Sequence, residues 1–121
     1  LFACARWHMK KGLKSEFYKA MTNEAMFGIA AFDAAGECVY LNYIGAALLD
    51  SQTPKLRDLI PPVDRPPLIR FSLELLRHEG LYHDILMKNV RGGTFIANLG
   101  VRHFTVKDVP LTVLMIQDVS L

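Results

Sequence analysis

Few residues in this chain have types and spacings that suggest catalysis or metal binding. Cys4 and Cys38 lie far apart and outside any CxxC-like spacing, so we expect free thiols rather than a zinc site or a disulfide framework. No Ser-His or Cys-His pairing of an activated nucleophile can be argued from spacing. The single carboxylates Asp33 and Asp84 leave one catalytic hypothesis, a small cavity-bearing, isomerase-like α+β enzyme.

The composition predicts one globular domain rather than a disordered or membrane-spanning chain. The 121 residues are 51% hydrophobic and 21% charged, and no apolar run reaches 18 residues. The net charge is +2 and the basic residues are scattered, so we expect no nucleic-acid partner. The sequence starts at Leu1, which suggests a piece of a longer cytoplasmic protein, with membrane contact only through a preceding segment.

The first 25 residues are predicted to form an amphipathic helix, distinct from the domain expected over 26–121. A helix with so narrow an apolar stripe packs on its own domain or pairs with a second copy of itself. We therefore predict a homodimer through this helix, with packing along the sheet as the other use of the same stripe. The stripe consists of Phe2, Met9, Leu13, Phe17 and Met21.

Two short strands and a helix start are predicted next. The apolar runs "FGIAAFD" and "ECVYLN" flank a turn that contains Gly36, as in a β-hairpin. Asp33, at the end of the first run, is expected to hydrogen-bond the backbone of the turn. Asn42 ends the second run, and we predict that it caps the helix formed by "YIGAALLD".

The middle of the chain is predicted to be irregular and then helical. Five prolines exclude long regular structure from 51–67, where "PKLRDLI" can hold one short helix. "PPLIRFSLELLRHEG" is predicted to be a long helix, capped by Asp64 and ended by Gly80.

The last third is predicted to be three strands. "LYHDILMKNV" and "TFIANLGVRHFTV" flank a glycine turn, and "LTVLMIQDVS" follows. In the second of these runs, Phe95, Ala97, Leu99 and Val101 should face inward and Asn98 and Arg102 outward. The whole order predicts an α+β domain with a five-stranded antiparallel sheet and helices packed on one face.

Three motifs in order resemble those of PAS domains, sensory modules of bacterial signalling proteins such as sensor histidine kinases. "GIAAFDAAGECVYLNYIGAALL" is similar to the opening of that family, "VRGGTFIANLGV" to its hairpin, and "MIQDVS" to its ending before a signalling helix. Gly92 stands where the family usually has aspartate. The resemblance implies a domain of a multidomain signal-transduction (two-component) protein. Such a domain senses a small ligand or mediates dimerisation, relays the change to a C-terminal output domain, and is not itself an enzyme.

The resemblance also suggests haem and a covalently bound flavin as ligands, but neither is expected in this protein. His78 and His83 do not fall on the inner helix face that would present a haem ligand. No cysteine lies between residues 39 and 121 for a photoadduct. A carboxylate-binding cluster of Arg91, Arg102 and His103 is disfavoured, because Arg102 should point outward.

An apolar pocket between the predicted long helix and the sheet is the remaining candidate site, and its ligand is unknown. Such pockets combine apolar walls with few polar groups, here Tyr40 and Asn98. The alternative left open is that the same side chains fill the core. The predicted pocket residues are Tyr40, Leu48, Leu68, Phe71, Leu75, Ile85, Met87, Phe95, Ala97, Leu99, Leu114 and Ile116.

Overall fold

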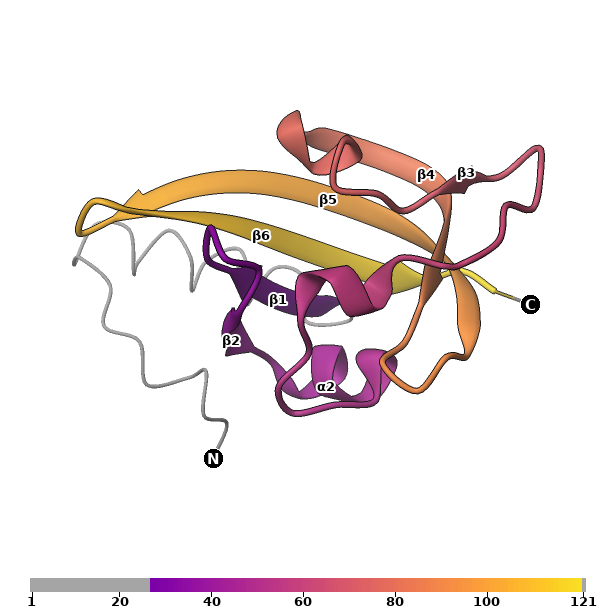
Figure 1. The fold of residues 1–121 in the computed structure, drawn as a ribbon, viewed down its shortest axis with the longest axis horizontal. Coiled ribbons are helices and arrows are strands. Elements are labelled where there is room, and N and C mark those ends of the chain that lie inside the picture. Colours follow the sequence, from indigo (N-terminus) through magenta and orange to yellow (C-terminus); the bar gives the residue numbers. More distant parts are fainter. Residues whose placement is uncertain (1–26, 121) are drawn as a thin grey trace.

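A six-stranded mixed sheet organises residues 27–120, the part of the chain that this computed structural model describes (Figure 1). The strands are β1 (Gly28–Phe32), β2 (Cys38–Leu41), β3 (Ile69–Arg70), β4 (Gly80–Lys88), β5 (Thr94–Val106) and β6 (Val109–Asp118). Their order in the sheet is β2-β1-β6-β5-β4-β3, so the last strand lies between the first strand and the β4–β5 hairpin. The α+β prediction is confirmed, but the expected count of five antiparallel strands is wrong because β3 adds a sixth, parallel to β4.

The β1–β2 hairpin forms where the sequence predicts it. The carboxylate oxygen Oδ1 of Asp33 accepts hydrogen bonds from the backbone N–H groups of Ala35 and Glu37, each at 2.9 Å. Gly36 has φ +82°, a conformation that glycine adopts without the steric cost of a side chain. Asp33 therefore serves the turn, as expected.

Helix α2 (Tyr43–Leu49) begins at the predicted cap. The N–H of Gly45 donates to Oδ1 of Asn42 at 2.7 Å, which satisfies one of the orphan donors of the first turn. The helix ends at Asp50, which has φ +54°, and the N–H of Ser51 donates to the carbonyl of Ala46. The buried side chains of Ala46 and Leu49 turn toward the sheet.

Both predicted hairpins in the last third of the chain are present, and their turns have different backbone conformations. Between β4 and β5, Asn89 and Gly93 share a backbone hydrogen bond, and Gly92 has φ +104°. Between β5 and β6, Lys107 and Asp108 both have positive φ, as in a type I′ turn, whose twist matches that of antiparallel strands.

The predicted long helix over 66–79 is wrong. This stretch contains the two-residue strand β3 and the 3₁₀ turn η3 (Leu75–Arg77), and the preceding segment contains the 3₁₀ turn η2 (Leu56–Leu59). The expected capping residue Asp64 instead lies 3.4 Å from Nε of Arg70, and Gly80 begins β4 rather than ending a helix.

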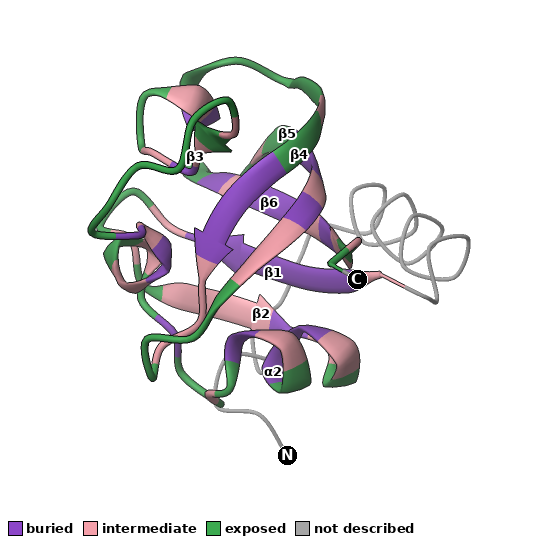
Figure 2. Ribbon diagram, turned by 90° about the vertical axis from the view of Figure 1, so that its right-hand side faces the viewer, coloured by how far each residue is buried: buried purple, intermediate pink, exposed green. Residues whose placement is uncertain are grey.

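The sheet has apolar clusters on both faces, which we call the inner and outer clusters. The inner cluster contains buried residues from five strands, α2, η2 and η3, so the described helix and turns pack on this one face, as predicted. The outer cluster contains Ile29, Ala31 and Val113, with Val39, Tyr40, Phe104 and Met115 packed against them. Figure 2 shows the buried stretches running through the central strands. Among residues 27–120, no helix is long and apolar enough to cross a bilayer.

Candidate functional site

The inner cluster gathers most of the predicted pocket residues. Leu48, Leu75 and Phe95 are half-buried and pack against it. β4, β5 and β6 place their alternate side chains on this face, because side chains along a strand point to opposite sides in turn. Seven predicted pocket residues are fully withdrawn from solvent within it: Phe71, Ile85, Met87, Ala97, Leu99, Leu114 and Ile116.

Three residues predicted to line or serve the pocket do not lie there. Tyr40 pairs with Ala31 and packs against the outer cluster, so it faces the opposite side of the sheet. Leu68 belongs to neither cluster. Asn98 alternates with the buried Ala97 and Leu99, and its Oδ1 accepts a hydrogen bond from the N–H of Asp84. The predicted polar handles are therefore absent from the inner face.

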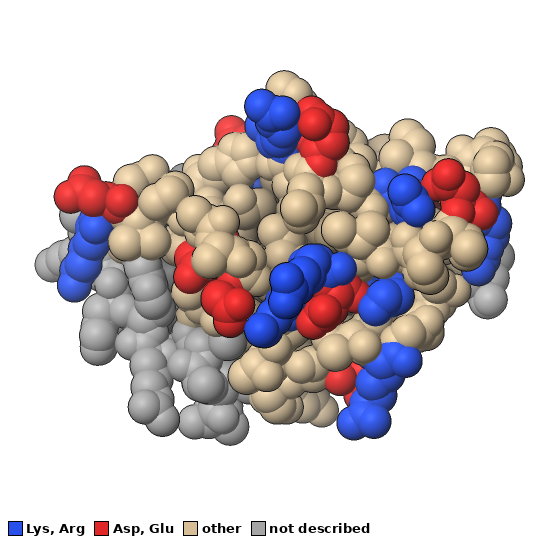
Figure 3. Space-filling view, viewed as in Figure 1, with Lys and Arg blue, Asp and Glu red and all other residues tan. Residues whose placement is uncertain are grey.

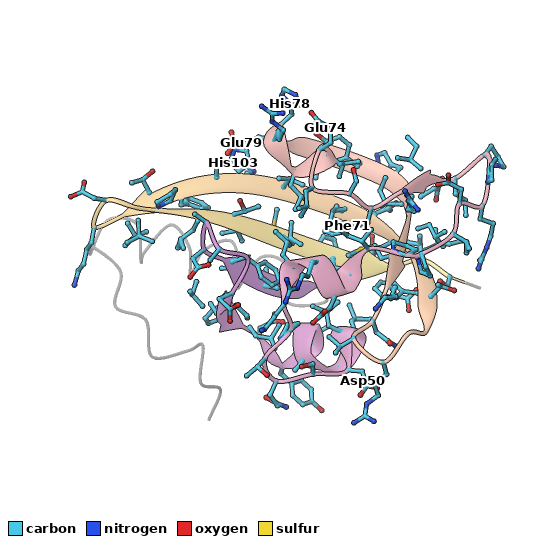
Figure 4. The ribbon with its side chains drawn as sticks, viewed as in Figure 1. Asp50, Phe71, Glu74, His78, Glu79 and His103 are labelled. Carbon is cyan, nitrogen blue, oxygen red and sulfur yellow. The ribbon has the colours of Figure 1, made fainter. Side chains whose placement is uncertain are left out.

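Phe71 closes the inner face beneath the segment that replaces the predicted helix. Its side chain is fully buried, and its N–H donates to the carbonyl of Leu86 at 2.9 Å, next to the β3–β4 pairing. Arg70, immediately before it, donates from Nη1 to the carbonyl of Pro61 and lies 3.4 Å from Asp64. Figure 4 shows Phe71 between this segment and the strands of the sheet. The chain thus supplies an aromatic ring of its own to the predicted pocket.

The far end of the same segment is attached to β5 through His103. Nε2 of His103 donates to the carbonyl of Leu76 at 2.7 Å, and the N–H of His103 donates to Oε2 of Glu79 at 2.7 Å. Figure 4 shows His103 and Glu79 side by side near η3. His103 is therefore a structural contact between the segment and the sheet.

Three hollows on the surface are lined by described residues. One of about 240 Å³ lies between the β1–β2 turn and η2 and includes Lys55, Arg57 and Leu73. A more open one of about 500 Å³ lies between the end of α2 and Val90–Arg91. The third, of about 290 Å³, lies on the outer face over Gly100. Of the predicted pocket residues, Leu99 alone lines any of these three.

The two carboxylates considered for catalysis have other surroundings. Both oxygen contacts of Asp33 are made to the turn described above. Asp84 is exposed in a β-bulge of β4, with φ +56°. Neither lines the three hollows. No observation on the described residues therefore favours the isomerase-like alternative.

The basic and ligating residues do not converge either. Arg91 Nε lies 2.9 Å from Asp50 Oδ2, whereas Arg102 points to the outer face and His103 to the inner one. His78 and His83 are exposed, and residues 27–120 contain no group of three potential metal ligands. On the face drawn in Figure 3, positive and negative side chains alternate, without a one-sign surface.

The end of β6 carries contacts that the sequence did not single out. Ser120 Oγ accepts from the N–H of Ile96 at 2.7 Å, and the N–H of Ser120 donates to Oδ1 of Asp118 at 2.9 Å. The N–H of Val119 donates to the carbonyl of Ile96. The chain is therefore still hydrogen-bonded to β5 at the point where it leaves the sheet. Asp118 and Ser120 both belong to the motif "MIQDVS", which was the one feature of the sequence that pointed to this end of the strand.

Comparisons with known proteins agree with the fold. A crystal structure of a PAS domain from a two-component sensor histidine kinase has a TM-score of 0.59 and 13% identity, covering 90% of this chain and 99% of that one. The PAS domain of an HTR-like protein from Haloarcula marismortui has a TM-score of 0.53 and 14% identity, covering 91% and 100%. No family model matches the chain, and no curated protein matches it in sequence. The protein thus has the PAS fold, as the motifs predicted.

Proposed function

We propose that this protein is a sensory domain of a cytoplasmic signal-transduction protein, and that it relays changes in its core to an output domain C-terminal to it. The setting suggested by the similar structures is a sensor histidine kinase, since one of them comes from such a protein. A small apolar ligand would bind within the inner cluster, beside Phe71, and change its packing. Alternatively, another chain would bind to the surface of the domain and change the same packing.

The position of β6 is the observation that carries this proposal. β6 lies between β1 and β5, and it contributes Leu114 and Ile116 to the inner cluster. The same strand ends at Asp118, and Ser120, two residues further on, is hydrogen-bonded to Asp118 and to Ile96 where the chain leaves the sheet. A signal changes an output only if two states differ in their contacts. β6 is suited to this, because it joins the core directly to the exit point.

The relay can be tested in the full-length protein by removing the contact at the exit. Ser120→Ala deletes the oxygen that accepts the Ile96 N–H, so we expect the output activity to lose its dependence on the signal. The matched control is Thr105→Ala, an exposed position at the opposite end of β5. Output activity is measured for both variants with and without the signal. An unchanged response in Ser120→Ala, with the domain folded, contradicts the relay.

A further inference from the structure

The hollow between the β1–β2 turn and η2 is built on a hydrogen-bonded backbone frame. The N–H of Leu56 donates to the carbonyl of Gly36 at 2.9 Å, and Glu37 and Lys55 form an isolated β-bridge. A Cβ on Gly36 would lie 3.4 Å from Cβ of Leu56, so the turn and η2 approach each other closely. The side chain of Asp33 holds the turn itself. The hollow is therefore formed before a ligand binds, which lowers the cost of ordering it.

Four apolar side chains line one part of this hollow, and its volume suits one small chemical group. They are Ala34, Ala35, Leu56 and Leu73. Leu73 is 52% exposed, although burial of such a side chain is favourable. The volume of the hollow is about 240 Å³. An apolar cavity of about 150 Å³ binds benzene, and pockets for drug-sized molecules measure about 300–1,000 Å³. The hollow therefore has room for a single ring or a branched alkyl group.

The charged residues that line the hollow are Lys55, Arg57 and Glu37, two positive and one negative. Nζ of Lys55 lies 3.9 Å from Oε2 of Glu37, which is a long ion pair between two exposed side chains. The guanidinium of Arg57 has no hydrogen-bond or ion-pair partner among residues 27–120. Arginine binds carboxylates through two parallel hydrogen bonds. One surplus positive charge suits a monoanion, whereas a dianion would be repelled more strongly by Glu37.

We propose that this hollow binds a small monocarboxylate that carries one apolar group, such as an aromatic ring. The carboxylate pairs with Arg57 and Lys55, and the ring lies against Leu73. Leu73 is two residues from Phe71, whose side chain is fully buried in the inner cluster. The bound ligand therefore holds this segment against η2, and it stabilises the packing of Phe71 from the surface of the domain.

This site is separate from the inner cluster and from the relay through Ser120. Binding to it is measured on the domain itself, so a failed relay leaves the site standing and the reverse also holds. All residues of the site lie within 27–120. The helix and the homodimer predicted from residues 1–25 lie outside the described part of the chain.

Phenylacetate and phenylacetamide test the need for a carboxylate, because they share a ring and differ in charge. Each is titrated into the full chain, and the backbone amide signals are followed by NMR. Phenylacetate should shift the signals of Gly36, Arg57 and Leu73 with a Kd on the order of 1 mM, as expected for about ten non-hydrogen atoms at an open site. Phenylacetamide should bind at least about threefold more weakly, because it cannot form the ion pair.

Arg57→Glu and Arg65→Glu make the same change in net charge at different places. Arg65 donates to Oγ1 of Thr94 and does not line the hollow. Arg57→Glu should weaken phenylacetate binding by roughly tenfold, because it places a like charge beside the carboxylate. Arg65→Glu is the matched control and should leave the affinity nearly unchanged. Leu73→Ser should weaken both ligands by a similar factor, since it removes a wall that both rings contact.

Hydrogen exchange tests the link to the inner cluster. The N–H of Phe71, which donates to the carbonyl of Leu86, exchanges when the segment opens. Opening that releases the ligand should slow this exchange by about tenfold when phenylacetate is present at about ten times its Kd. An unchanged rate at saturation would refute the link.

Three further results would overturn the site itself. Equal affinities for phenylacetate and phenylacetamide would show that the carboxylate is not recognised. Equal weakening by Arg57→Glu and Arg65→Glu would show a general effect of charge. Signal shifts that do not saturate, or that gather around one of the other two hollows, would show that the ligand does not bind between the β1–β2 turn and η2.

Discussion

Asn42 shows how one side chain can hold two elements together. Besides capping α2, its Oδ1 accepts from the N–H of Ile29 at 2.9 Å, and its Nδ2 donates to the carbonyl of Phe27 at 3.1 Å. The capping role was predicted from the sequence. The bonds to Ile29 in β1 and to Phe27 just before it were not, because these partners lie 13 and 15 residues away and adjacency in the sheet is not visible in a local pattern.

We expect Asn42→Ala to lower the free energy of unfolding by about 2 kcal/mol, since a cap is lost and the amide of Ile29 is left without its acceptor. Asn42→Asp is the matched control. It keeps both acceptor contacts but replaces the donor to Phe27 with a carboxylate oxygen that repels this carbonyl, so it should lose stability through that contact while the cap is kept. Urea unfolding followed by circular dichroism measures both. A change below about 0.5 kcal/mol for Asn42→Ala would show that the contacts carry little stability.

At the scale of elements, two glycines allow α2 to lie directly against β1. A Cβ on Gly28 would lie 2.9 Å from Cα of Gly45. A Cβ on Gly45 would lie 3.0 Å from both the carbonyl oxygen of Ile29 and Cδ1 of Leu41. The two elements therefore approach more closely than side chains would permit.

Gly45→Ala should destabilise the domain, against the sign of helix propensity. Alanine in a helix is favoured over glycine by about 1 kcal/mol, whereas overpacking costs about 1–3 kcal/mol. Ala47 is exposed on the same helix. The control Ala47→Gly should therefore cost about 1 kcal/mol by propensity alone. The midpoint of thermal unfolding gives the sign for each, and a stabilised Gly45→Ala variant would refute the close approach.

The segment over 66–79 shows why an element prediction failed. Its apolar spacing fits a helix, but Ile69 and Leu73 are 59% and 52% exposed, so the apolar residues do not share one buried face. The N–H of Phe71 bonds to β4, and Ser72 Oγ accepts from the N–H of Leu75 at 3.3 Å. A hydrogen bond to a neighbouring strand and a local contact of the serine side chain therefore take the place of the hydrogen bonds of a helix. Tertiary context here outweighs the intrinsic helix propensity of the segment.

At the scale of the whole molecule, substitution of Phe71 tests whether the inner cluster is a tightly packed core or a loosely packed one. Phe71→Ala should lower the free energy of unfolding by about 3–5 kcal/mol, because a fully packed ring leaves a cavity. Leu73→Ala, two residues away and half exposed, should cost about 0.5 kcal/mol or less. Urea unfolding measures both, with Phe71→Leu as a milder variant. Equal losses at the two positions would contradict the packed core.

Local chemistry determined much of this protein from its sequence alone. The turn at Asp33, the cap at Asn42, both later hairpins and the inward alternation of Ala97, Leu99 and Val101 follow from short-range preferences. The same order of elements indicated the PAS fold. These features could be predicted because each depends on residues close together in the chain.

Only the tertiary structure decided which side chains meet. It placed Tyr40 on the outer face, added β3 beside β4, and filled the inner face with Phe71. It also joined Ser120, where the chain leaves the sheet, to Ile96 of β5 by a hydrogen bond. These outcomes depend on pairings between residues far apart in sequence. Strand register and competing hydrogen bonds set such pairings, and no local pattern encodes them.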